Sequence, residues 1–267
     1  AGTSASAPRQ TLSNARTRFN AMNAGDTVAL CRTGAWNANG GTVYNTRCRA
    51  DNTCDFRDYI PSWGSSDSAR PRLNTTSGRV FSMETLGHDE GYRYWNLDIR
   101  QTGASQSDGF FMYNDVSDVD ICNVRLETTP LTGGGLAIYP HPQSAGTGIV
   151  IRNNQIYNYS FCGIYGGSPG LVIDSNYFEN NGLPASPQDH TIYLTGTVGR
   201  NTGMIVKNND AYVNSSCGGV IFVFHQDLPN LTVDENRITS PSTTVNCFRI
   251  QSSSSAATDP AHFLNGK

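Results

Sequence analysis

The 267-residue sequence predicts an all-β solenoid, in which short strands from successive coils of the chain stack into parallel sheets. Composition is the first observation behind this prediction. Asparagine occurs 25 times and glycine 27 times, whereas lysine occurs twice and glutamate five times, and this balance disfavours helices. The second observation is self-similarity, because two strand-like units recur at a period typical of solenoids.

The first unit is an apolar stretch in which a central aliphatic residue is usually followed by an aromatic one. It recurs as SMET, FFMYND, LAIYPH, CGIYGG, HTIYLT, GVIFVF and FRIQSS. Since side chains alternate along a strand, we expect the position after the central residue to point away from the core. This outward column, at intervals of 26–29 residues, consists of Glu84, Tyr113, Tyr139, Tyr165, Tyr193, Phe222 and Gln251.

The second unit has two apolar residues two positions apart, followed by a polar pair that ends in asparagine. Examples are IVIRNNQI, LVIDSNYF, MIVKNNDA and LTVDENRI, with Asn154, Asn176, Asn209 and Asn236 in register. Their spacing predicts coils of about 22–33 residues. Stacked coils place equivalent residues about 4.8 Å apart. An asparagine at the same tight corner of every coil tolerates a left-handed backbone and can hydrogen-bond its neighbours along the stack.

We expect one domain over residues 1–267. Residues 9–24 are predicted to form an N-terminal helical cap, because Leu12, Phe19 and Met22 have helical spacing and the open end of a solenoid needs a cover. The coils are predicted to occupy residues 25–251. The Ser- and Ala-rich residues 252–267 are expected to form a loosely held C-terminal tail.

Composition also bears on partners and on location. The net charge is −3 and no basic stretch occurs, so a nucleic-acid partner is not expected. The sequence has no run of 18 apolar residues, so no membrane span is predicted. Seven cysteines, among which Cys48 and Cys54 could close a small loop with Cys31 nearby, favour an oxidising compartment. Together with an opening AGTSASAPRQ that looks like a secreted product after signal removal, this predicts a secreted or periplasmic protein.

The repeats resemble the right-handed parallel β-helix of the pectate-lyase-like superfamily. The capping helix followed by AGDTVAL also resembles the entry to the first coil in the secreted polysaccharide lyases of that fold. The resemblance covers nearly the whole chain and implies a single-stranded right-handed parallel β-helix. Signatures of polygalacturonases (NTD, DD, GHG) and of pectate lyases (WxDH, RxPxxR) are absent from the sequence. Tailspike proteins of the same fold form trimers, so the oligomeric state is predicted as monomer or trimer.

The resemblance also implies where chemistry takes place. In this fold the asparagine-bearing corner joins the second and third sheets, and the active sites of polysaccharide lyases lie on the first sheet, which here carries the tyrosines. Flat phenol rings stacked along the axis can contact the apolar faces of sugar rings, and an arginine can hold a carboxylate. The predicted substrate-binding residues are Tyr113, Asp115, Tyr193 and Arg249.

Four residues are predicted to be catalytic, namely Tyr139, His141, Tyr165 and His190. His141 is expected to point outward beside Tyr139, where an imidazole can transfer protons near neutral pH. Strand alternation predicts that His190 points inward, as a hydrogen-bonded core histidine. The alternative is that the strand start turns it into the cleft, where Asp189 would orient it.

No cofactor is predicted. Four aspartates, whose carboxylates are the kind of ligand that calcium prefers, bunch around one coil, but they form no compact acidic loop. Ca²⁺ therefore stays as the alternative, and no spacing of cysteine and histidine suggests zinc. The aspartates are Asp108, Asp115, Asp118 and Asp120.

The sequence favours a secreted polysaccharide lyase that cleaves an acidic, uronate-containing glycan by β-elimination with a Tyr/His acid–base pair. The few cations along the tyrosine face disfavour a densely charged polymer. Two alternatives stay open. A non-catalytic glycan-binding or adhesion β-helix would use the same tyrosines, and a glycoside hydrolase would need two carboxylates, for which Glu84 and Asp115 are the candidates.

Overall fold

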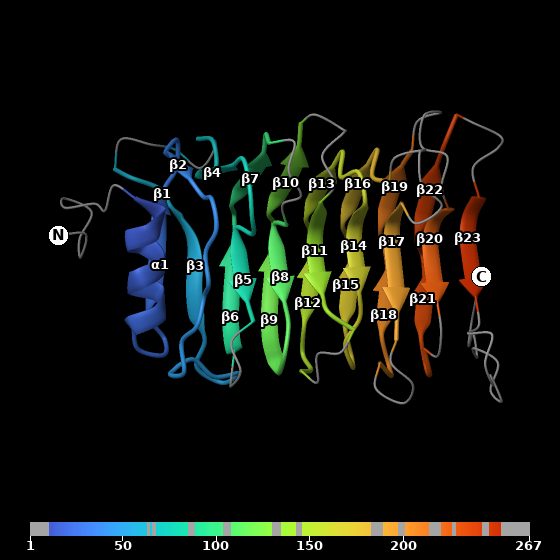
Figure 1. Cartoon of the computed structure of the whole chain (residues 1–267), viewed down its shortest axis with the longest axis horizontal. Helices are drawn as coiled ribbons and strands as arrows, with labels where there is room; N and C mark the ends of the chain where they lie inside the picture. Colours follow the sequence, from blue (N-terminus) through green and yellow to red (C-terminus); the bar gives the residue numbers. More distant parts are fainter. Residues whose placement is uncertain are drawn as a thin grey trace.

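A computed structural model of the chain describes residues 11–62, 65, 68–84, 89–103, 108–129, 135–142, 146–182, 189–196, 201–213, 220–225, 228–241 and 246–251. Residues 9–10 of the predicted cap and the predicted tail 252–267 lie outside these ranges. The described chain winds into coils that stack along one axis, with a helix at the N-terminal end (Figure 1). None of the helices in these ranges is long and apolar enough to cross a membrane.

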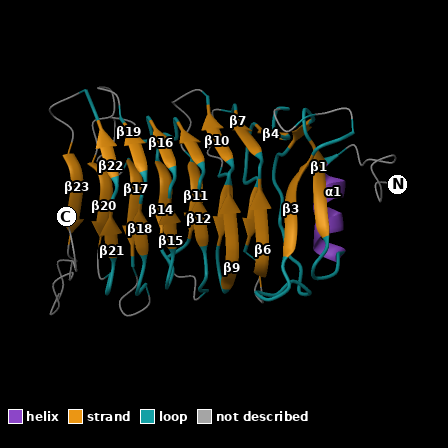
Figure 2. Ribbon diagram, turned by 180° about the vertical axis from the view of Figure 1, so that it is seen from behind, coloured by secondary structure: helices purple, strands orange, loops and turns teal. Residues whose placement is uncertain are grey.

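Three sheets of parallel strands form the walls of the solenoid (Figures 1 and 2). The first sheet consists of β5 (Phe81–Met83), β8 (Phe110–Met112), β11 (Leu136–Pro140), β14 (Cys162–Gly166), β17 (His190–Thr195), β20 (Val220–His225) and β23 (Asn246–Gln251). The second consists of β1 (Thr27–Cys31), β3 (Cys54–Tyr59), β6 (Asp89–Trp95), β9 (Val116–Cys122), β12 (Val150–Arg152), β15 (Val172–Asp174), β18 (Ile205–Lys207) and β21 (Thr232–Asp234). The third consists of β2 (Ala35–Asn37), β4 (Arg72–Thr75), β7 (Asp98–Gln101), β10 (Arg125–Thr128), β13 (Gln155–Tyr157), β16 (Tyr177–Glu179), β19 (Asp210–Tyr212) and β22 (Arg237–Thr239).

The predicted parallel β-helix is confirmed, and so is the order of its sheets. Each coil passes from the tyrosine-bearing first sheet to the second and then through the asparagine corner to the third, as β11, β12 and β13 illustrate. Strands of three to seven residues are too short to bury apolar surface on their own. Stacking lets them share one continuous core, which explains why the repeated pattern was visible in the sequence.

The predicted capping helix is also confirmed, as α1 (Leu12–Ala21). It begins at Thr11, whose side chain accepts a hydrogen bond from the backbone N–H of Asn14, and this satisfies one of the unpaired donors of the first turn. Leu12 and Phe19 are buried, and the ring of Phe19 lies 5.2 Å from that of Tyr92. The helix therefore closes the N-terminal end of the core.

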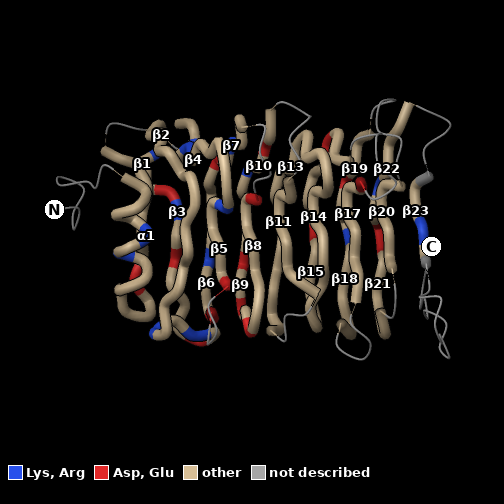
Figure 3. The backbone as a smooth tube through the Cα atoms, viewed as in Figure 1, with Lys and Arg blue, Asp and Glu red and all other residues tan. Residues whose placement is uncertain are grey.

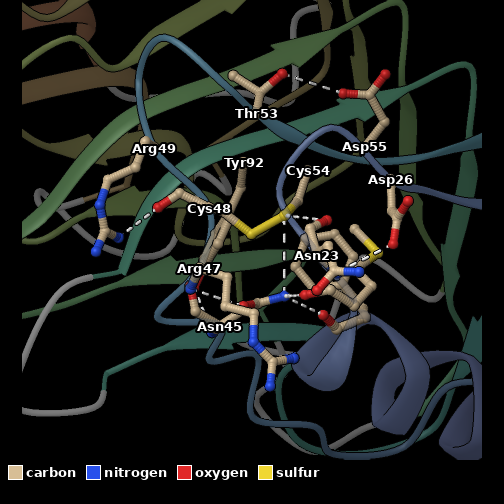
Figure 4. The surroundings of a disulfide bond; sticks show 12 residues. Asn23, Asp26, Asn45, Arg47, Cys48, Arg49, Thr53, Cys54, Asp55 and Tyr92 are labelled. Atoms are coloured by element: carbon tan, nitrogen blue, oxygen red, sulfur yellow. Dashed lines mark hydrogen bonds between the residues drawn. A yellow bond between two sulfur atoms is a disulfide. The ribbon is translucent and has the colours of Figure 1, made fainter.

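A disulfide joins Cys48 to Cys54 beneath the C-terminal end of α1 (Figure 4). Asn45 connects the two features, because its side-chain amide donates to the carbonyl oxygens of Phe19 and Met22 and contacts the sulfur of Cys54 at 3.8 Å. A loop of this size constrains the unfolded chain by about 2 kcal/mol. The disulfide thus helps to hold the cap and the first coils together.

The asparagine corner forms a buried hydrogen-bonded ladder. The side-chain amide of Asn154 donates to the side-chain oxygen of Asn176, that of Asn176 donates to Asn209, and that of Asn209 donates to Asn236, over distances of 2.8–3.0 Å. The ladder asparagines themselves are not left-handed. The residue before each one takes the positive φ, with values of 49–57° at Asn153, Ser175, Asn208 and Glu235. That arrangement leaves the ladder side chain free to point into the corner.

Candidate functional site

A repeated irregularity determines which side chains reach the outer face of the first sheet. In β14, two consecutive positions face the core: a Cβ at Gly163 would lie 3.2 Å from the ring of Phe178, and Ile164 belongs to the core cluster. The pairs Ala137–Ile138 and Ile221–Phe222 are likewise both in the core cluster. Simple alternation along these strands therefore fails, and positions three apart share the outer face.

His190 is the residue most affected by this irregularity. The sequence leaves two orientations open for it. Its ring is buried, with 3% exposed, and it lies on the Tyr193 side of the strand, where it stacks on the ring of Tyr193 with centroids 5.2 Å apart and planes inclined by 16°. The backbone carbonyl of Val220 lies 2.8 Å from Nδ1 of His190. Since a carbonyl oxygen only accepts hydrogen bonds, Nδ1 donates and the neutral ring keeps its lone pair on Nε2. Burial, with a further contribution from the positive charge of Arg249, lowers the pKa of His190 below its ordinary value.

An aromatic row runs along the outer face, one ring per coil. It consists of Phe111, Tyr139, Tyr165 and Tyr193, and successive ring centroids lie 5.1–5.2 Å apart. The predicted column is correct from Tyr139 to Tyr193 and wrong at both ends. Phe111, rather than Tyr113, is in register with Tyr139.

At the other end of the row, Val223 rather than Phe222 is in register with Tyr193, because Phe222 pairs with Ile192 and is buried in the core. Arg249 pairs with Val223 and continues the row on β23, with an exposed side chain. Arg249 was predicted two positions away from the tyrosine column. Arg249, a predicted binding residue, therefore lies in the same row as Tyr193, two strands further along the axis.

Tyr193 and His225 form a hydrogen-bonded pair of proton-transfer groups on this face. The hydroxyl of Tyr193 and Nδ1 of His225 lie 2.9 Å apart in a hydrogen bond. His225 ends β20, in register with Thr195, so the bond crosses diagonally between neighbouring strands. Burial lowers the pKa of His225 and raises that of Tyr193, so at neutral pH the pair consists of a phenol and a neutral imidazole.

His225 was not among the predicted catalytic residues. Aligning the strands by their central aliphatic residues put Phe222 beside Tyr193, which moved His225 out of register. Aligning the strand ends, HTIYLT with VIFVFH, would have placed His225 beside Thr195. The missed signal is therefore the position at which β20 ends, His225, one residue beyond the predicted unit GVIFVF.

The remaining predicted residues gather at the N-terminal end of the row. His141 lies beside Tyr113, with ring centroids 4.3 Å apart, and 5.1 Å from the ring of Tyr139. Burial, with the charge of Arg79 as a further cause, lowers the pKa of His141. Burial and the neighbouring Tyr165 raise the pKa of Tyr139 to about 12. The Tyr139 hydroxyl therefore stays protonated at neutral pH.

Arg79 occupies the same end of the face. Its guanidinium lies 3.2 Å from the ring centroid of Phe111 and forms ion pairs with Glu84 at 2.8 Å and Asp108 at 3.3 Å. Asp108 also accepts a hydrogen bond from the backbone N–H of Leu136. Both carboxylates are thus bound to one guanidinium, an arrangement unlike the separated acid and base of a glycosidase.

Asp115 lies apart from these groups. It is exposed in the bend between β8 and β9, and the predicted register of Asp115 with His141 is wrong because His141 donates its backbone N–H to Met112. Of the other clustered aspartates, Asp120 is ion-paired with Arg152 at 2.8 Å. Among the described residues, no three His, Cys, Asp or Glu side chains gather in a way that could hold a metal ion.

Comparisons with known proteins agree with this architecture. The chain is similar to an alginate lyase from Paenibacillus sp. strain FPU-7, whose crystal structure superposes with a TM-score of 0.50 at 13% sequence identity over 97% of both chains. At that identity the likeness concerns the fold. No curated protein matches the sequence. Residues 104–258 match the model of the right-handed β-helix region, which is more than half of the chain. The chain therefore belongs to the right-handed β-helix family.

Proposed function

We propose that the protein is a polysaccharide lyase that cleaves a uronate-containing glycan by β-elimination on the outer face of the first sheet. The observation that carries this proposal is the hydrogen bond between Tyr193 and His225. It lies at one end of a row of aromatic rings suited to sugar faces. The likeness in fold to an alginate lyase is consistent with the proposal.

Arg249 supplies the first requirement of the reaction. Elimination starts at C5 of a uronate, whose proton becomes acidic when the adjacent carboxylate is neutralised. Arg249 is two strands beyond Tyr193 in the same row, or about 10 Å along the axis. Both side chains are long enough to converge on one sugar unit, so the guanidinium binds the carboxylate while the phenol reaches C5.

Tyr193 and His225 then move the proton. As the phenol oxygen takes the proton from C5, its own proton passes to Nδ1 of His225, the C4–C5 double bond forms and the bond from C4 to the leaving oxygen breaks. Tyr193 gives its proton to the leaving oxygen and recovers one from His225. The sum is one proton moved from C5 to the leaving oxygen, and both side chains end as they began.

His190 is a positioning residue in this scheme. It is 3% exposed, anchored to the carbonyl of Val220 and stacked on Tyr193. The contact fixes the plane of the phenol ring on one side, while Tyr165 lies 5.2 Å away along the row. The hydroxyl is thereby held in line with His225.

The function is tested by incubating the protein with a panel of uronate-containing glycans and following the ultraviolet absorbance of the unsaturated product. We expect absorbance to rise with at least one polymer and to rise more slowly after His225→Asn. Reducing ends that appear without ultraviolet absorbance would instead indicate hydrolysis and would contradict the proposal.

The pKa shifts predict the pH dependence of kcat/KM. His225 must be neutral to accept a proton, and its pKa is lowered, so activity should fall only below about pH 6.5, the ordinary value for histidine. Tyr193 must be protonated, and its pKa is raised, so activity should persist to about pH 10. A pH profile of kcat/KM measures both limits. An acidic limb well above neutrality would argue against His225 as the acceptor.

The second candidate function is glycan binding without catalysis, which the aromatic row alone would support. It requires no proton transfer, so Tyr193→Phe and Tyr165→Phe should then have similar effects. For either function we propose an extracellular location, because the disulfide between Cys48 and Cys54 is stable in oxidising compartments.

A further inference from the structure

The outer face of the first sheet carries very little charge. The seven strands of this sheet that the structure describes contain a single charged residue, Arg249 on β23. Figure 3 shows the charged residues concentrated elsewhere in the stack. On the second sheet, for example, Lys207 faces Asp174 at 3.6 Å.

The other cation at this face is already neutralised. Arg79 binds the carboxylates of Glu84 and Asp108 and rests on the ring of Phe111. A ligand carboxylate arriving there would have to displace Glu84 or meet its charge. This end of the row is therefore suited to hydroxyl groups, which can accept from a guanidinium and donate to a carboxylate.

The three histidines among the described residues do not add positive charge at neutral pH. Burial is the largest influence on His141, His190 and His225, and it lowers the pKa of each below its ordinary value. The segments outside the described residues can add little positive charge, as the sequence shows. Between residues 84 and 246 these segments contain a single Arg or Lys, Arg200.

We infer that the substrate is a linear glycan in which single uronates are separated by neutral sugars, rather than a polyuronate charged at every unit. The inference rests on the proposed function and names its substrate class. One uronate lies between Tyr193 and Arg249, and the neighbouring neutral sugars lie over Tyr165 and Tyr139, toward the end where Arg79 covers the ring of Phe111. Each additional carboxylate placed on the phenol rings would lose hydration without gaining a cation, which is unfavourable.

Binding to the Tyr193→Phe variant tests the inference apart from catalysis. The probes are polyglucuronate, with a uronate at every unit, hyaluronan, with one at every second unit, and deacylated gellan, with one at every fourth. We expect gellan to bind at least about tenfold more tightly than polyglucuronate. Its affinity should change by less than about twofold between about 20 mM and about 500 mM NaCl, because one exposed ion pair contributes little.

Tightest binding of polyglucuronate, with an affinity that falls steeply as salt is added, would overturn the inference and leave the lyase proposal intact. If the variant binds gellan but the wild-type protein releases no ultraviolet-absorbing product from any polymer, the ligand class is supported and the lyase proposal is overturned. The two failures are therefore distinguishable.

Glu84→Gln provides an independent test through charge. The substitution leaves Arg79 paired with Asp108 alone, so polyglucuronate should bind about threefold to tenfold more tightly and gellan should be unchanged within about twofold. The matched control is Glu179→Gln on the third sheet, whose carboxylate accepts from the hydroxyl of Tyr177. It should change neither affinity. Equal effects of the two substitutions would overturn the inference.

Discussion

Tyr193→Phe is expected to lower kcat by about 100- to 10,000-fold, the range for loss of a positioned proton-transfer group. The substitution removes the hydroxyl that is bonded to His225 and leaves the ring between Tyr165 and His190. Glycan affinity should therefore stay within about threefold of the wild-type value, since the ring contact with sugar is retained. Initial rates of ultraviolet absorbance and a direct binding isotherm measure the two quantities.

Tyr165→Phe is the matched control for this prediction. Tyr165 lies in the same row and stacks on Tyr193, but it belongs to β14, which pairs with β17, whereas His225 is on β20, on the far side of β17. We expect its kcat to fall by less than about tenfold. Similar losses from the two substitutions would mean that the hydroxyl of Tyr193 has no special part in the reaction.

Asn176→Ala is expected to have the largest effect on stability, about 2–4 kcal/mol. Asn176 is 1% exposed, and its amide donates to the side chain of Asn209 and to the carbonyl of Ile151. Its oxygen accepts from both the backbone and the side chain of Asn154. Removing it leaves several buried polar groups unpaired at one corner. Thermal unfolding should show a decrease in Tm of about 5–15 °C.

Asn236→Ala provides the comparison, because Asn236 is the last and partly exposed member of the ladder. Water can replace part of what is lost there, so a decrease in Tm at most half as large is expected. Equal effects at the two positions would show that burial of the ladder is not what makes it stabilising.

The stacking of coils could be predicted because it depends on patterns that survive in a single sequence. The ladder asparagines recur once per coil, and the apolar residues of α1 have helical spacing. Both patterns follow from the shared core, which the coils build and the helix covers. The ladder pattern alone does not identify which residue of the corner is left-handed. A corner of this kind needs one residue with positive φ, here Asn153, and a second whose side chain points inward, here Asn154.

The site was less predictable because it depends on registration between strands. Alternation left the orientation of His190 open, and the paired inward positions, Gly163 and Ile164 on the neighbouring strand, decide which side of the strand its ring occupies. The bond between Tyr193 and His225 joins neighbouring strands. The register of those strands differs by one residue from the register expected from the sequence. No periodicity within a single strand reports such a diagonal contact.

The mass of the cleavage products distinguishes elimination at Tyr193 from hydrolysis. Wild-type protein is incubated with deacylated gellan and, in parallel, with polyglucuronate, and the oligosaccharides released are analysed by mass spectrometry. Elimination at Tyr193 should give products that end in an unsaturated uronate and are one water lighter than the corresponding hydrolysis products, with Tyr193→Phe releasing almost none. Products carrying the mass of added water, or unsaturated products released equally well by Tyr193→Phe, would contradict it.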